Sequence, residues 1–345
     1  MALEETDWAE KAAKCGNHSQ AELDRVQEGT MSTTAPVRAR QSYRHEAFLW
    51  RGRTDFVQGL TPFVQEGIDA GEAVMVVVIP EHARWMRKNL GRSASQVKFV
   101  DMTELGRNPA CIIPAWQNFL DECSGFGRPV RGIGEPIWPG RRPEEMSECQ
   151  LHEALLNLAV DPDLPFWLIC PYDSEHLDDE VLAEAGRSHP ALATVATYHG
   201  SAAYRGIAHA EELFTAGLPA VGGVSAGTVV TNRASLQASA EYVSLQAASA
   251  DLWSHKIIRL TNAVRALTIS GLRRGAERIR IDLWNQPEVF ICDVTDDTVI
   301  DDLLIGRRAP QHAGQDAVWL ANHQCDLVQA RSSKRGTTIR LHMRK

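Results

Sequence analysis

A continuous apolar run, EAVMVVVIP at residues 72–80, limits the fold of this sequence more than any other feature. An unbroken run of this length that ends in proline is typical of a strand buried on both faces of a sheet. Further strand signals occur as VKFVDM at 97–102, PVRGIGEPIW at 129–138 and PFWLICPYD at 165–173, with helical patterns between them. Because strands that alternate with helices form mainly parallel sheets covered on both faces, we predict an α/β domain over residues 43–198.

The last third of the chain follows a different pattern. A helical segment at 251–270 precedes two strand signals, RIRIDLW and VFICDVTDD, which are separated by NQPE. A second helix, DAVWLANHQCDLV at 316–328, and a final strand, GTTIRLHM at 336–343, complete the pattern. Helices combined with hairpin-like strands predict an α+β two-layer sandwich, which we place at residues 231–345.

The segments outside these two domains are polar or rich in small residues. Residues 1–42 have little periodicity, which predicts a flexible tail, and Met31 within them is an alternative to Met1 as the native start. Residues 199–230 contain many Ala, Gly and Ser residues, as in GLPAVGGVSAGTVV. This composition predicts a linker between the two domains.

Composition excludes several classes of protein. The 44% of hydrophobic and 23% of charged residues are typical of a globular chain rather than a disordered one. The acidic start lacks a signal-peptide core and no apolar run is long enough to cross a bilayer, so we expect a cytoplasmic protein with no membrane contact. Seven cysteines without a small-scaffold spacing fit free thiols in a reducing compartment. The net charge of -8 argues against a direct nucleic-acid binder.

An asparagine in the segment IIRLTNAVRA raises the question of a ligand site. Asn262 follows Ile258 and precedes Ala266 and Ile269 at helical spacing, which predicts an amide on an apolar face. A buried amide without partners costs about 1–3 kcal/mol, so the side chain needs either a structural partner or a ligand.

The same region resembles a known family. TNAV on a helix, then CDVTDD, then WLANHQCDLVQARSSKRGTTIRLHM are similar, in order and spacing, to the histidine-kinase-like ATPase fold in its anti-sigma-factor branch. The resemblance covers about residues 230–343. It implies that Asn262 stands where the family's asparagine reaches magnesium and phosphates, and that Asp296 stands where the family's aspartate reads the adenine amino group.

The sequence departs from this family at the positions that carry catalysis. The resemblance puts Ile258 where the family has its general base, a glutamate, and Thr298 where it has the glycine of D-x-G. Without the glutamate, the group that would activate the attacking hydroxyl is missing. At Thr298, a β-branched side chain stands where the nucleotide's adenine ring would meet bare backbone. We therefore predict no catalytic residue in this domain.

The lid that cradles phosphates in that family also differs. Its two glycines fall on Gln315 and Ala317, Gly314 lies out of register, and Asp316 brings a negative charge to the place where phosphates would bind. We expect a vestigial nucleotide site made of Asn262, Asp296, Thr298, Gly314 and Thr337. No cofactor is expected, and ATP with magnesium would bind only if this degenerate site still accepts it.

The first domain resembles a second family. HEAFLWRG, DMTELGRNPACIIPAWQNFLDE, RPVRGIGEPIWPGRRPEEMSECQLHEALLNLAV and FWLICPYD are similar to the MEDS sensory domain over residues 45–190, which implies a RecA-like fold placed ahead of a regulatory output. No phosphate-loop motif occurs at WRGRTDF, so nucleotide hydrolysis is not expected there.

Polar and aromatic residues near the ends of two predicted strands indicate a sensor pocket. GEPIW and CPYD bring Glu135, Trp138, Tyr172 and Asp173 to the carboxyl ends, where open α/β sheets bind ligands. Trp138 is alternatively a loop anchor against the core.

The segment ECQLHE adds two further candidates, Cys149 and His152, on one helix face with Glu148. A single C-x-x-H is short of the four ligands of a structural zinc site, so we expect no metal and read the helix as packing its thiol inward.

Two basic segments, GRR at 306–308 and RSSKR at 331–335, stand out in an acidic chain. They are either solvated loops or a docking surface for an acidic partner.

Together, these patterns predict a bacterial signal-responsive regulator of transcription, in a stress response, whose sensory domain controls a pseudokinase-like output domain of anti-sigma-factor type. The resemblance implies a sigma factor or an anti-anti-sigma (STAS) protein as partner, and a small molecule as signal. The alternative is an ATP-dependent serine/threonine kinase that phosphorylates a STAS antagonist. A third reading is a small-molecule sensor whose output domain only forms a homodimer.

Overall fold

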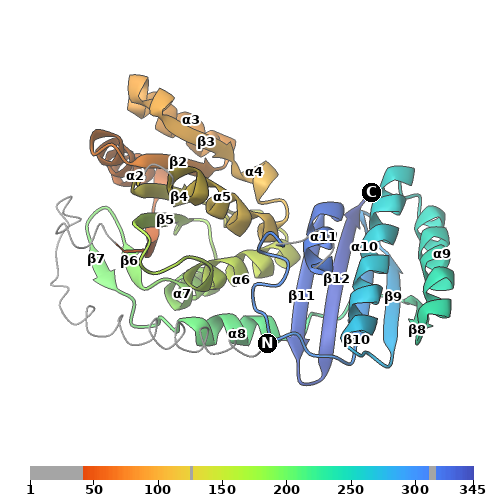
Figure 1. Ribbon diagram of the computed structural model, residues 1–345. Helices are drawn as coiled ribbons and strands as arrows, with labels where there is room; N and C mark the ends of the chain where they lie inside the picture. Colours follow the sequence, from red (N-terminus) through yellow and green to blue (C-terminus); the bar gives the residue numbers. More distant parts are fainter. Residues whose placement is uncertain (1–41, 125–126, 311–315) are drawn as a thin grey trace. The chain divides into compact units, whose positions relative to one another are not determined.

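The computed structural model describes residues 42–124, 127–310 and 316–345 (Figure 1). The described residues form two compact units, and each unit has its own hydrophobic core. The first unit comprises the described residues up to Leu105 together with Trp116–His209, and the second comprises Gly106–Ala115 and Ala210–Lys345. The predicted tail, with Met31, lies outside the described residues except for Ser42.

A seven-stranded sheet forms the first unit, in the order β3-β2-β4-β5-β1-β6-β7. All neighbours pair in parallel except β6 and β7, which are antiparallel. The prediction of a mainly parallel sheet is therefore confirmed. The strands are β1 (Arg44–Trp50), β2 (Ala73–Val78), β3 (Val97–Asp101), β4 (Val130–Gly134), β5 (Phe166–Asp173), β6 (Ala191–Ala193) and β7 (Tyr198–Gly200).

Helices cover both faces of this sheet. From β1 the chain crosses to β2 and then to β3, toward one edge of the sheet. It then returns in the opposite direction to β4, β5 and β6. Because parallel crossovers are right-handed, the helices of the outward crossovers and those of the return crossovers lie on opposite faces of the sheet. Accordingly α2 packs on α3, and α6 packs on α7 (Figure 1). All six residues of β2 are buried, as the apolar run predicted. The helices are α2 (Gly52–Asp69), α3 (Pro80–Leu90), α4 (Met102–Leu105), α5 (Ile112–Ser124), α6 (Pro143–Ala159) and α7 (Asp179–Ser188).

The second unit contains an antiparallel five-stranded sheet in the order β11-β12-β10-β9-β8. Helix α10 packs on β9, β10 and β12 and contacts both α9 and α11 (Figure 1). This arrangement confirms the predicted α+β class. The strands are β8 (Ala226–Val230), β9 (Ile279–Asn285), β10 (Val289–Asp296), β11 (Leu327–Ser333) and β12 (Gly336–Arg344), and the helices are α9 (Arg233–Ser249), α10 (Ser254–Arg273) and α11 (Ala317–Gln324).

The buried face of α10 differs from the one that the sequence suggested. Leu260, Ala263 and Leu267 are buried, whereas Asn262 is exposed and Ile258 is 62% exposed. Positions two residues away from Leu260 lie about 200° around an α-helix, so they point away from the face that packs on the sheet. The prediction that Asn262 lies on the apolar face is wrong, and its amide needs no buried partner.

Regular structure also occurs between residues 199 and 230, where the sequence predicted a linker. Helix α8 (Ile207–Thr215) lies in this stretch, and β8 pairs with β9 at the edge of the second sheet. The segment between α8 and β8 has no helix or strand. Within the described parts of the chain, no helix has the length and apolar character needed to cross a membrane.

Candidate functional site

A buried carboxylate lies at the carboxyl ends of the central strands of the first unit. Glu135 directly follows β4, and its Oε2 accepts a hydrogen bond of 3.1 Å from the backbone N–H of Ile79, the residue after β2. Its Oε1 lies 2.7 Å from His82 Nδ1 on α3. Burial raises the pKa of Glu135, although His82 and the Ile79 N–H counteract it and Asp173 adds to it. The strand ends thus hold a proton-binding pair that the sheet and α3 keep out of water.

Aromatic rings surround the imidazole of this pair. The ring of His82 lies 4.5 Å from that of Phe56, 4.5 Å from that of Trp85 and 5.3 Å from that of Trp50, measured between centroids. Trp50 is the last residue of β1 and is itself buried. The polar pair is therefore enclosed by packed aromatic side chains.

Asp173, at the end of β5, lies beside this site. Its register partner in β1 is Trp50, whose carbonyl oxygen accepts hydrogen bonds from the Ser174 N–H and hydroxyl, both at 3.0 Å. The Asp173 carboxylate accepts from the Glu175 N–H at 3.0 Å and lies 2.9 Å from His176 Nδ1. The structure therefore places Glu135 and Asp173 on the same sheet edge, as the sequence suggested.

The other predicted pocket residues have different surroundings. Trp138 is half-buried and stacks under the guanidinium of Arg141, whose Cζ lies 3.7 Å from the ring centroid. Cys149 is buried on α6 and donates to the Pro136 carbonyl at 3.2 Å, and burial raises the pKa of its thiol to about 12. His152 is buried on the same helix. Tyr172 of β5 is buried too, and burial raises the pKa of its hydroxyl well above the ordinary value.

An open cavity of about 280 Å³ lies at the opposite end of the first sheet. Ala73 at the start of β2, Phe119 of α5 and the ion pair of Lys98 with Glu122 contribute to its lining. It therefore lies away from the predicted strand-end pocket, since Ala73 and Glu135 mark opposite ends of the parallel strands.

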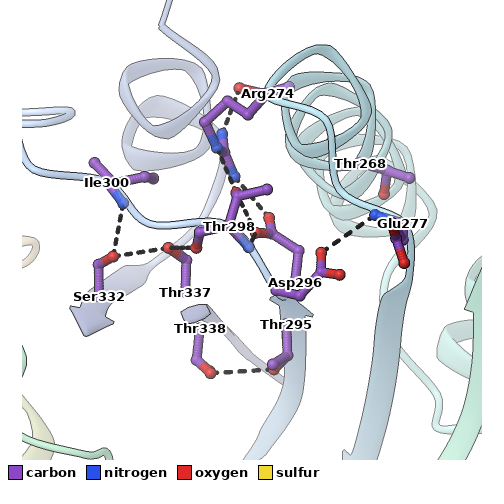
Figure 2. Close-up of polar contacts among 12 residues, drawn as sticks. Thr268, Arg274, Glu277, Thr295, Asp296, Thr298, Ile300, Ser332, Thr337 and Thr338 are labelled. Carbon is purple, nitrogen blue, oxygen red and sulfur yellow. Dashed lines mark hydrogen bonds and ion pairs between the residues drawn. The ribbon is translucent and has the colours of Figure 1, made fainter. Parts of the chain in front are cut away.

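The second unit contains a polar network around Asp296, the last residue of β10 (Figure 2). Its Oδ2 accepts a hydrogen bond of 2.6 Å from Arg274, which follows α10. Its Oδ1 accepts from the N–H of Thr298 at 2.9 Å and from the hydroxyl of Thr298 at 2.5 Å. Arg274 Nε also donates to the Thr298 hydroxyl at 2.9 Å. Both oxygens of this buried carboxylate are thus occupied by groups of the same chain.

Thr337 extends the network to the β11–β12 hairpin. Its hydroxyl donates to the Thr298 carbonyl at 2.8 Å and lies 2.9 Å from the Ser332 hydroxyl, which accepts from the Ile300 N–H at 2.8 Å. Figure 2 shows these side chains lying together between the end of β10 and the hairpin. The structure therefore brings together Asp296, Thr298 and Thr337, three of the residues that the resemblance suggested.

The remaining nucleotide-site positions lie apart from this network or outside the described residues. Asn262 and Ile258 are on the exposed side of α10. Asp316 caps α11, where its Oδ1 accepts from the Val318 N–H at 2.8 Å and from the Trp319 N–H at 2.9 Å. Ala317 is the first residue of that helix, and Gly314 and Gln315 lie outside the described residues. The charge that was expected to oppose phosphates serves as a helix cap.

The two basic segments are partly buried. Arg307 and Arg331 are buried, so they do not belong to fully solvated loops, whereas Lys334 and Arg335 are exposed at the β11–β12 turn. Arg308 is half-buried, so the cations of these segments nearest to solvent are Arg308, Lys334 and Arg335.

The first unit is thus an α/β domain with a mainly parallel sheet, and Glu135 and Asp173 lie at the carboxyl ends of its strands. Residues 44–190 match the MEDS family, which is described as the methanogen/methylotroph, DcmR sensory domain. The chain therefore contains a MEDS sensory domain at these residues. No curated protein matches the chain at a significant level. The second unit is defined by its antiparallel five-stranded sheet and its helices.

Two residues of these sites escaped the sequence reasoning. His82 lies in PEHARWM, and Arg274 lies in a run of two arginines before a glycine, so neither stands out in the sequence. Each is the charge partner of a residue that the sequence did identify, Glu135 and Asp296 respectively. The signal that could have found them is a basic or imidazole side chain in a helix, or directly after one, that packs near the end of a strand carrying a carboxylate.

Proposed function

We propose that this protein is a signal-responsive regulator in which the MEDS domain controls an output unit of anti-sigma-factor type that acts by binding a protein. The sensory half of this proposal rests on the family match at residues 44–190. The output half rests on the resemblance of the second unit and on the chemistry of its Asp296 network.

The single observation that carries the output half is the occupation of Asp296. A carboxylate that reads adenine accepts a hydrogen bond from the amino group of the base. In this chain each oxygen of the buried carboxylate already accepts a hydrogen bond, from Arg274 or from Thr298. An adenine amino group would compete with an ion pair of 2.6 Å for this carboxylate, and Ile258 would still supply no base. These features favour binding over ATP chemistry.

Exposed apolar side chains on the second unit support a role in protein binding. Trp253 precedes α10 and is 68% exposed, and Ile258, five residues later on the helix, is 62% exposed. Aromatic and large apolar residues are enriched at the centres of protein interfaces. The start of α10 is thus our candidate contact surface for a sigma factor or a STAS-type antagonist.

The test uses the full chain as bait in an extract of its own cells. Wild-type protein is compared with a Trp253→Ala/Ile258→Asp variant, and Leu245→Ala, an equally exposed change on α9, is the matched control. We expect the wild type and the control to retain a sigma factor or a STAS protein and the double variant to lose it. Retention of neither class by the wild type would contradict the proposal.

The purified complex then separates binding from catalysis. With labelled ATP and magnesium we expect no phosphate transfer to the partner, and Ile258→Glu alone should not create it because the lid residues are unchanged. Transfer by the wild type that Asn262→Ala abolishes would establish the kinase alternative instead.

A further inference from the structure

A second polar cluster lies inside the first unit, within its sheet and helices. His45 of β1, Glu153 of α6, Cys170 of β5 and His189 between α7 and β6 bring one nitrogen, oxygen or sulfur atom each to within 4.8 Å of one another. All four side chains belong to residues that are 2% exposed or less. The proposed function uses none of them.

Three of the separations are close to those between ligand atoms around a tetrahedral metal ion. Glu153 Oε2 lies 3.0 Å from His45 Nε2 and 3.2 Å from His189 Nε2, and Cys170 Sγ lies 3.4 Å from His45 Nε2. Zinc binds nitrogen and oxygen at about 2.0–2.2 Å and sulfur at about 2.3 Å, so tetrahedral ligand atoms lie roughly 3.3–3.6 Å apart. All four atoms lie within 4.8 Å of one another, so one ion can be reached from each of them by side-chain adjustment.

The orientation of His45 is fixed by a neighbour outside the cluster. Asn157 Nδ2 donates to the Ser188 carbonyl at 2.8 Å, so its Oδ1 is the acceptor for His45 Nδ1 at 3.1 Å. Because a neutral imidazole carries one proton, a proton on Nδ1 leaves a lone pair on Nε2. The lone pair points into the cluster.

His189 is held in the same tautomer. Its Nδ1 lies 2.8 Å from the carbonyl oxygen of Ala185, which can only accept, so Nδ1 carries the proton and Nε2 is bare. Hydrogen-bonded second nitrogens of this kind orient the histidine ligands of metals.

Bare lone pairs that converge in a closed space repel each other unless a cation lies between them. Among the described residues, neither His189 Nε2 nor Glu153 Oε1 finds a hydrogen-bond partner, although both are fully buried. His189 Nε2 is close to the Glu153 carboxylate without a hydrogen bond to it. His45 Nε2 lies at hydrogen-bond distance, 3.0 Å, from Glu153 Oε2, so one contact of the cluster can be a hydrogen bond while two of its buried polar atoms stay without a partner in the described part of the chain.

We infer that His45, Glu153, Cys170 and His189 bind one divalent transition-metal ion of the zinc type. Two imidazoles, one thiolate and one carboxylate are ligands that zinc accepts in tetrahedral sites. Binding replaces the thiol proton of Cys170, which leaves to solvent, and the two negative ligands balance the charge of the ion. Because four protein ligands close the shell, the ion has a structural role and no open position for a substrate.

The ion would join parts of the first unit that are far apart in the chain. It links neighbouring strands β1 and β5 to α6 and to the segment that leads into β6. The rings of Tyr43, stacked 6.1 Å from His45, and of Tyr172, 5.6 Å from His189, provide an apolar surrounding. An ion in this place holds together the central strands of the sensory domain.

The test begins with the full wild-type chain, stripped with a chelator and titrated with cobalt alone. We expect uptake of one ion per chain with the intense visible bands of a tetrahedral site and a near-ultraviolet thiolate-to-cobalt band. Zinc should displace these bands and raise the midpoint of thermal unfolding. No saturable uptake, or a weak octahedral spectrum without a thiolate band, would overturn the inference.

Variants then assign the ligands. Cys170→Ser should abolish the thiolate band. Asn157→Leu removes the acceptor of His45 Nδ1 and the donor to the Ser188 carbonyl but no ligand, so it should weaken cobalt binding about 10–100-fold while the band remains. The matched controls are Cys149→Ser and His82→Gln, which alter another buried thiol and another buried imidazole–carboxylate pair of the same unit. Loss of the band in Cys149→Ser with its retention in Cys170→Ser would refute the assignment, and the wild-type spectrum decides the question if a ligand variant does not fold.

Discussion

At the scale of single residues, the buried carboxylates of this chain depend on partners from elements distant in sequence. Glu135 is held by His82 and the Ile79 N–H, and Asp296 by Arg274 and Thr298. A buried carboxyl without such partners would be destabilising, so each contact ties a residue of α3, or the residue after α10, to the end of a strand.

The first prediction concerns the pH dependence of this pair. Since burial raises the pKa of Glu135, the folded protein binds the proton more tightly than the unfolded chain does. The stabilisation that this proton provides is complete below the ordinary carboxyl pKa and is lost as the pH rises through the raised value. The free energy of unfolding of the wild type, relative to Glu135→Gln, should therefore fall as the pH increases above about 4.5.

Urea denaturation of both proteins between acidic and neutral pH measures this difference. The exposed carboxyl of Glu122 provides the control, because Glu122→Gln should give a difference that is flat by comparison. A wild type that gains stability over Glu135→Gln with rising pH would show that His82 outweighs burial.

At the scale of elements, the β11–β12 hairpin depends on a glycine that closes it against β10. Gly336 has φ +115°, and a Cβ built there would lie 2.2 Å from the backbone oxygen of Asp296. The hairpin carries Thr337, which joins the Asp296 network to β12. The turn and the network therefore depend on the same close approach of two backbones.

The second prediction compares two glycines with positive φ in this unit. Gly336→Ala should lower the free energy of unfolding by about 3 kcal/mol or more, because strain adds to a contact with backbone that cannot move aside. Gly275→Ala has a similar φ of +93° but open space at the Cβ, so it should lower it by about 1–2 kcal/mol. Chemical denaturation of the two variants gives the values, and equal losses would show that the contact with Asp296 relaxes freely.

Several elements could be predicted from the sequence because their residues alone show their environment. The apolar run of β2 and the glycine- and proline-bounded strands β4 and β5 are buried on both faces, as expected. Strand β1, RHEAFLW, escaped notice because a central strand that carries His45 and Glu46 lacks a continuous apolar run. The edge strands β8 and β11 were missed because small or polar residues alternate there without a strong period.

Sites were harder to predict than elements because their parts are distant in sequence. Glu135 and Asp173 were recognisable since strand ends mark them, but their partner helix was not. The cluster of His45, Glu153, Cys170 and His189 spans 144 positions, so only the register of β1 with β5 and the packing of α6 bring it together. The exposed position of Asn262 was misjudged because isoleucines on its side of α10 imitate an apolar face.

At the scale of the whole molecule, two independent cores meet the requirement for separately folding units. One core is built on β2, β1 and α2 and the other on β10, β12 and α10. Each contains apolar residues from its own sheet and helices, as expected of domains that can fold alone. The division of the chain into a sensory and an output domain remains a prediction that proteolysis can test.

The third prediction is that, C-terminal to residue 43, thermolysin cuts the native chain first before Val224, between α8 and β8. Val224 is 96% exposed and follows Gly222 and Gly223, so its backbone can enter a protease site without unfolding of either sheet. The cut should yield a fragment that ends at residue 223 and a fragment 224–345, and the second fragment should keep all of β8 to β12 and remain folded by circular dichroism. Val224→Gly should remove this cut, because thermolysin needs a bulky apolar residue after the bond, whereas Val195→Gly in the exposed β6–β7 turn should not affect it. Early cleavage inside 52–173 would mean that the sensory unit opens more readily than the connection and that the boundary is misplaced.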